Sequence, residues 1–68
     1  MKISARNQIP ATVTGITQGE AAANVELDAN GLRLVASITV EAVRDLGLQQ
    51  GTQVTALIKA SDVLLATE

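Results

Sequence analysis

Residues 21–40, AAANVELDANGLRLVASITV, contain two alternating runs on either side of Asn30-Gly31. Before this pair the apolar residues occupy odd positions, and after it they occupy even positions. Alternation with a period of two is typical of a half-buried strand. Asn-Gly between two such runs is the strongest short-range hairpin signal, because a type I′ turn needs positive φ at both central residues. The stretch therefore predicts a β-hairpin.

A long strand is expected before this hairpin. Apolar residues fall on odd positions from Ile9 to Val13, and the parity changes at Gly15. An isolated glycine at a change of parity indicates a bulge or a sharp bend within one strand. Pro10 cannot donate a ladder hydrogen bond, so it should lie at an edge or at a kink. The segment Gln18-Gly19-Glu20 predicts the turn into the hairpin.

A short helix and two further strands are expected after the hairpin. Thr39 is a candidate N-cap, and Gly47 is placed to end the helix in the left-handed conformation. Alternation over residues 54–60 predicts a fourth strand, and Val63 to Ala66 predict a fifth. Five strands with a helix between the third and the fourth are typical of an all-β, five-stranded, OB-like Greek-key barrel. We expect residues 1–68 to form a single domain.

The composition limits how this domain gains its stability. A chain of 68 residues buries only about 60% of its unfolded surface. It has neither cysteine nor histidine, which excludes disulfides, thiolate metal sites and the commonest general base. Small domains that lack disulfides and structural metal sites often gain stability by oligomerising. Because 47% of the residues are hydrophobic, we expect part of the apolar surface to face other subunits.

The charge and residue content argue against several functions. Five basic residues face seven acidic ones, and there is no Phe, Tyr or Trp, so neither many phosphate contacts nor base stacking is available for nucleic acid. No apolar run approaches the roughly 20 residues that span a bilayer, and residues 1–20 contain no signal-peptide core. We therefore expect a cytoplasmic protein without nucleic-acid or membrane partners. No nucleophile–base arrangement is present, so we expect neither an enzyme nor an organic cofactor.

Two short stretches suggest a site for a small anion. Ser4-Ala5-Arg6-Asn7 and Lys59-Ala60-Ser61 each combine a cation, a small residue and a hydroxyl. Two cations would neutralise a dianion, whose burial unpaired is costly, while hydroxyls and backbone N–H groups would satisfy its oxygens. Taken singly, the first stretch would be a solvated strand edge and the second an ordinary turn. Thr39 could complete the anion shell or simply cap the helix.

Several motifs together resemble the molbindin (Mop) family over essentially the whole chain. They are Ile3–Gln8, Ala36–Thr39, Leu46–Leu48 with Gly51, Val54–Ala56 and Ile58–Ser61. The resemblance implies a small cytoplasmic protein with an OB-like barrel that binds molybdate or tungstate, the metal being held only as its oxyanion. It also implies a homohexamer, arranged as a trimer of dimers, with oxyanions between subunits. The implied binding residues are Ser4, Ala5 and Arg6 of one subunit, Lys59, Ala60 and Ser61 of a neighbour, and Thr39.

The resemblance further implies a role in storing or buffering molybdate or tungstate for molybdenum homeostasis. A second class of site near the threefold axes is implied too, with the Gln18-Gly19-Glu20 turn as a possible contributor. This chain has Ile9-Pro10-Ala11 where family members often have Leu-Lys-Gly, and Glu20 near a position where they often have lysine. It therefore has fewer cations in that region.

Two alternatives remain open at this point. Residues 43–51 also resemble the middle of small swapped-hairpin DNA-binding regulators, although the acidic balance and the Asn-Gly hairpin count against such a regulator. A plain oligomerisation domain would share the fold but bind no specific ligand. Within the leading hypothesis, molybdate and tungstate have nearly the same charge and geometry, so no side chain distinguishes them.

Overall fold

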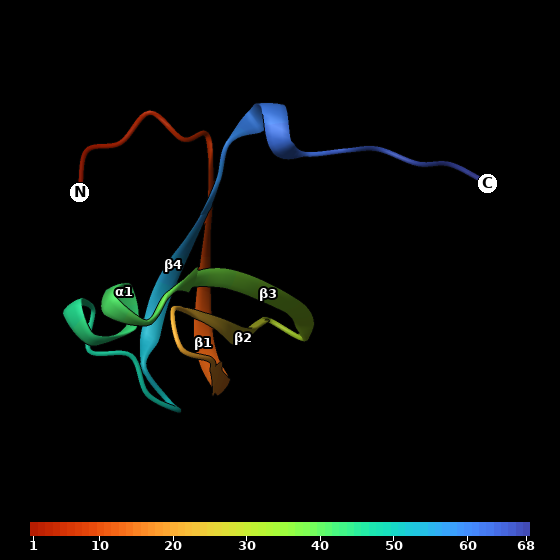
Figure 1. Ribbon diagram of the computed structural model, residues 1–68. Coiled ribbons are helices and arrows are strands. Elements are labelled where there is room, and N and C mark those ends of the chain that lie inside the picture. Colours follow the sequence, from red (N-terminus) through yellow and green to blue (C-terminus); the bar gives the residue numbers. More distant parts are fainter.

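The computed structural model describes residues 1–68 as one antiparallel sheet with a short helix at its side (Figure 1). The strands run in the spatial order β3-β2-β1-β4, and each is antiparallel to its neighbours. This arrangement confirms the all-β class and the helix between the third and fourth strands. The elements are β1 (Asn7–Gln18), β2 (Ala22–Ala29), β3 (Leu32–Thr39), α1 (Val40–Asp45), β4 (Gln53–Ile58) and the 3-10 turn η1 (Ala60–Asp62).

The β2–β3 hairpin forms as the Asn-Gly pair predicts. Asn30 has a φ of 54° and Gly31 a φ of 92°, both in the left-handed region. The Gly31 N–H also donates a 3.0 Å hydrogen bond to Oδ1 of Asp28. The register places Ala29 opposite Leu32, so the two central residues form the whole turn. Local turn chemistry therefore sets the pairing of these two strands.

Strand β1 is the longest strand, and it pairs with both β2 and β4. Its register with β2 shifts between Val13 and Gly15, which confirms the predicted bulge. Pairing with β2 begins only at Thr12, whereas Pro10 lies opposite Thr55 of β4. Pro10 thus has a strand neighbour on one side only, as a residue without an N–H group requires.

Helix α1 begins with the predicted cap. The Ala42 N–H donates a 3.0 Å hydrogen bond to the Thr39 hydroxyl, which fills one of the unpaired donors of the first turn. Gly47 follows the helix with a φ of 63°, in the left-handed region that often ends a helix. No helix is both long enough and apolar enough to cross a membrane.

The hydrophobic core is small and lies between the sheet and α1. Val13 and Val25 are its most deeply buried side chains, at 1% and 2% exposure. Helix α1 contributes Val40 and Val43 from one face, three positions apart. The complete core comprises Ala11, Val13, Ala23, Val25, Leu27, Ala29, Val40 and Val43.

Replacing Leu27 by alanine should destabilise the protein strongly, because Leu27 is the largest side chain of this core. Leucine-to-alanine changes in cores typically cost about 2–5 kcal/mol. Urea unfolding should show this loss, whereas Thr17→Ala on the exposed part of β1 should change stability by no more than about 0.5 kcal/mol. Equal unfolding midpoints for the two variants would contradict the assignment of the core.

The predicted fifth strand is wrong for the single chain, since Val63 to Ala66 form no strand. Strand β4 ends at Ile58, and η1 then turns the chain through hydrogen bonds from Asp62 N–H to Lys59 O (2.8 Å) and from Val63 N–H to Ala60 O (3.3 Å). The C-terminal segment consequently runs away from the sheet (Figure 1). The sheet stays open between β3 and β4, and no strand of the chain itself closes the barrel.

Candidate functional site

The start of β1 and the end of β4 bring both predicted anion-binding stretches to one end of the sheet. Asn7 lies opposite Ile58 in the ladder, and Nδ2 of Asn7 donates a 3.0 Å hydrogen bond to the Ile58 carbonyl. Beyond this pair the two chain segments flank a surface hollow. The hollow is lined by Ile3, Ser4, Ala5, Arg6, Leu57, Lys59, Ala60, Ser61 and Asp62. A single chain therefore brings together two motifs that the resemblance assigned to two subunits.

Arg6 shapes the N-terminal wall of this hollow. Its Nε donates to the Ser4 carbonyl at 2.9 Å, and its Nη2 donates to the Ile3 carbonyl at 3.4 Å. Gln8 adds a 3.0 Å hydrogen bond from Nε2 to the Ala5 carbonyl. These local bonds hold the segment in a compact bend and leave guanidinium donors available for a ligand.

Neither cation of the hollow is neutralised by a carboxylate. The ion pair of the chain joins Arg33 to Glu26, on neighbouring strands outside the hollow. Arg6 therefore forms no ion pair with a carboxylate in this structure. Lys59, which caps η1 without a side-chain hydrogen bond, likewise has no ion-pair partner. Two positive charges without an ion-pair partner thus line one hollow.

Asp62 is a lining residue that the sequence analysis did not select. It is the last residue of η1, directly after Ser61. Its carboxylate lowers the positive potential that Arg6 and Lys59 create. The signal that could have found it was its place immediately after the Lys-Ala-Ser motif.

The hollow is open to solvent in the single chain. Its polar and charged side chains are exposed, and Ala5 is the one lining residue that is partly buried. Charges separated by water attract each other weakly, so tight binding of a dianion here requires a cover that excludes water.

Thr39 lies outside the hollow, and so does the Gln18-Gly19-Glu20 turn. The Thr39 hydroxyl already accepts from Ala42 N–H as the cap of α1. Gln18 ends β1, and the turn after it is closed by a 2.8 Å bond from Gly19 N–H to the Ala22 carbonyl. These residues are not brought to the two cationic motifs.

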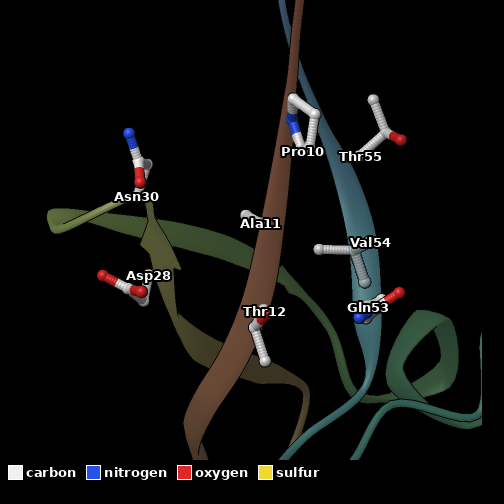
Figure 2. Close-up of a pocket in the computed structure, with 8 residues that line it drawn as sticks. All are labelled: Pro10, Ala11, Thr12, Asp28, Asn30, Gln53, Val54 and Thr55. Atoms are coloured by element: carbon white, nitrogen blue, oxygen red, sulfur yellow. The ribbon is translucent and has the colours of Figure 1, made fainter.

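A second polar hollow lies over β1, between the end of β2 and the start of β4 (Figure 2). Figure 2 shows Asp28 and Asn30 on one side of it, and Gln53 and Thr55 on the other. Asp28 is its charged residue, and no lysine or arginine lines it. An anion would meet a like charge there, so this hollow does not suit an oxyanion. The chain also contains no group of three or more acidic side chains that could hold a metal ion.

Known proteins are similar to this chain over nearly its entire length. The family model described as the TOBE domain matches residues 3–65. Molybdenum-pterin-binding protein 3 of Clostridium pasteurianum is 39% identical over 66 residues, covering 96% of this chain and 97% of that protein. The molybdenum import ATP-binding protein ModC of Brucella suis biovar 1 is 55% identical over 62 residues, or 90% of this chain. This chain spans only 17% of the length of that ModC protein.

Solved structures show the same fold. A molybdate-binding protein from Sporomusa ovata has a TM-score of 0.95 and 45% identity, covering 98% of this chain and 100% of that one. The cytoplasmic molybdate-binding protein ModG, in a form with molybdate bound, has a TM-score of 0.84 and 41% identity. That match covers 88% of this chain and 43% of the ModG chain. At 45% and 41% sequence identity, these matches show a common family as well as a common fold.

Proposed function

This chain belongs to the TOBE-domain family and, within it, to the molbindins (Mop proteins); on that premise we propose that it binds molybdate or tungstate and stores or buffers it inside the cell. The relatives that it matches over nearly their full length are named as molybdenum-pterin-binding and molybdate-binding proteins. The proposed role is binding without catalysis, and the ligand is the intact oxyanion.

The observation that carries this proposal is the meeting of Arg6 and Lys59 at one hollow without a neutralising partner. A tetrahedral dianion needs about two positive charges and several neutral donors. The hydroxyls of Ser4 and Ser61 supply such donors. Ala5 and Ala60 are small enough for backbone N–H groups to approach the ligand, and such groups form anion-binding concavities.

Thr39 remains in the proposed set of binding residues on the resemblance alone. Its oxygen accepts the Ala42 N–H, but the hydroxyl hydrogen can still donate to a ligand. It would serve an anion bound near the start of α1, away from the Arg6 and Lys59 hollow. The full proposed set is Ser4, Ala5, Arg6, Thr39, Lys59, Ala60 and Ser61.

The proposed assembly is a homohexamer, a trimer of dimers, with oxyanions bound where subunits meet. The exposure of the hollow supports this, since a neighbouring copy would exclude water and strengthen both charge interactions. We place the protein in the cytoplasm, as the description of its relative ModG favours. The comparisons favour this function over the DNA-binding alternative, because the relatives that match nearly end to end are named for binding molybdenum species.

Titration calorimetry with molybdate, in a buffer containing excess sulfate, tests the proposed function. We expect saturable binding that persists in sulfate, because a site with fixed backbone donors selects the larger tetrahedral anion by radius. Tungstate should compete with molybdate, since it has the same charge and shape. The mass of the oligomer is measured in the same sample. An intact oligomer that gives no heat with either anion would contradict the proposal and favour a plain oligomerisation domain.

A further inference from the structure

The turn between β2 and β3 carries the one asparagine of the chain that is followed by glycine. Asn30 and Gly31 are both exposed. Apart from the chain neighbours of Gly31, no atom lies within 4 Å of the point where a side chain would begin there. The other two asparagines, Asn7 and Asn24, lie in strands and precede residues with larger side chains. The backbone nitrogen that follows an asparagine is therefore least hindered at Asn30.

An asparagine followed by an unhindered backbone nitrogen can lose its side-chain amide without an enzyme. A base removes the proton of the Gly31 N–H, and the nitrogen lone pair attacks Cγ of Asn30. The new N–Cγ bond closes a succinimide ring, and the side-chain NH2 group takes up one proton and leaves as ammonia. Water then opens the ring at either carbonyl carbon, which gives aspartate or isoaspartate. One water is consumed and one ammonia is released, and nothing is oxidised or reduced.

A carboxylate holds the proton that this reaction must remove. The Gly31 N–H donates a 3.0 Å hydrogen bond to Oδ1 of Asp28, and Figure 2 shows Asp28 and Asn30 on the same side of the hollow over β1. This hydrogen bond stabilises the protonated nitrogen, and the negative charge beside it disfavours the nitrogen anion. Arg33, the ladder neighbour of Asp28, is paired with Glu26. The Asp28 carboxylate therefore has no ion-pair partner that competes with the turn.

We propose that Asn30 is a deamidation site and that Asp28 protects it by retaining the proton of the Gly31 N–H. Deamidation to aspartate adds a negative charge next to Asp28, and deamidation to isoaspartate adds a methylene to the backbone of a two-residue turn. Because this turn sets the register of β2 and β3, the longer backbone strains their pairing. The protection preserves the hairpin and goes beyond the proposed function, because it does not depend on anion binding.

Incubation of the folded protein at mildly alkaline pH, followed by tryptic digestion and mass spectrometry, tests the proposal. Trypsin cleaves after Arg6 and Arg33, so one peptide contains all three asparagines and reports their relative rates. We expect Asn30 to be converted first. Asp28→Ala should speed this conversion roughly threefold to tenfold, the factor that corresponds to the loss of one hydrogen bond. Asp45→Ala removes an exposed carboxylate of α1 and changes the net charge equally, so it should leave the rate unchanged.

Hydrogen exchange of the Gly31 N–H is a second measurement that passes through the same nitrogen anion. It is followed by NMR on isotope-labelled protein. We expect Asp28→Ala to raise this exchange rate by the same factor as the deamidation rate. Both differences should disappear when the wild type and the variant are unfolded in urea, because the hydrogen bond exists only in the folded turn.

Several results would overturn the proposal. Earlier conversion of Asn7 or Asn24 would contradict the site. Equal deamidation rates in Asp28→Ala and the wild type, with unchanged circular dichroism, would contradict the protection. A slower reaction in the variant would mean that Asp28 is the base that removes the proton. If the variant does not fold, hydrogen exchange of the wild type decides, since exchange of the Gly31 N–H at the rate of the unfolded chain would show that Asp28 does not retain the proton.

Discussion

Arg6→Ala and Lys59→Ala should each weaken molybdate binding about thirtyfold or more and leave the fold intact. Each change removes one of two cations that face the same hollow and have no carboxylate partner. Loss of one partner from a desolvated charge pair typically costs about 2–5 kcal/mol, and each 1.4 kcal/mol corresponds to about tenfold in affinity. Neither side chain belongs to the core, so the urea midpoint should hardly change. Titration calorimetry and urea unfolding on the same samples check both parts.

Arg44→Ala is the matched control for these two variants. Arg44 is an exposed arginine of α1 outside the hollow, and it has no ion-pair partner. Its removal changes the net charge by the same amount, so it reports general electrostatic attraction, which salt screens over about 10 Å. Equal losses for Arg44→Ala and Arg6→Ala would mean that net charge, and not the hollow, sets the affinity.

A mixture of Arg6→Ala and Lys59→Ala chains separates the two possible arrangements of the motifs. The structure places both motifs on one chain, through the pairing of Asn7 with Ile58. The family resemblance implies that the motifs of neighbouring subunits combine. If each site is built from one chain, every site in the mixed oligomer lacks either Arg6 or Lys59 and stays defective. If sites are shared between chains, binding recovers wherever Arg6 of a Lys59→Ala chain meets Lys59 of an Arg6→Ala chain. The stoichiometry of tight binding in the mixture therefore shows which chains build the site.

Features set by neighbouring residues could be predicted from the sequence. The hairpin turn needs only the backbone preferences of Asn30 and Gly31, and the helix start needs only the hydroxyl of Thr39. The bulge in β1 follows from one glycine at a change of parity. In each case the physical cause lies within a few residues of its effect.

Features set by distant pairing could not be predicted in full. The alternation over residues 54–60 does not show that η1 begins at Ala60, because the 3-10 hydrogen bonds compete with the ladder only where β1 no longer offers a partner. The pattern at Val63–Ala66 predicts a strand but not which edge, or which chain, supplies its partner. The candidate site depends on the same kind of pairing: the sequence places Asp62 directly after Lys59-Ala60-Ser61, but only the fold brings Arg6 to the same hollow.

The double variant Leu64→Asp/Leu65→Asp should dissociate the assembly into single chains. Leu64 and Leu65 are 90% and 92% exposed in the single chain, and burying one leucine side chain against a neighbouring subunit contributes about 1.5–3 kcal/mol. Aspartate removes this contribution and places charges at an apolar contact. Sedimentation velocity over a range of concentrations measures the change in mass. Leu32→Asp is the control, because Leu32 is an exposed leucine, at 59%, outside the C-terminal segment. An unchanged oligomer mass in the double variant would contradict a role of the C-terminal segment in the proposed assembly.

The same double variant shows whether the anion site depends on assembly. Val63 directly follows η1, so docking of the C-terminal segment would fix the position of Lys59 and Ser61 and bring a second copy over the hollow. A dissociated chain leaves both cations in water, where their attraction for a dianion is weak. We therefore expect the double variant to lose tight molybdate binding although Arg6 and Lys59 are intact. Wild-type affinity in a demonstrably single chain would mean that the hollow needs no neighbour, and that the motifs of one chain form the whole site.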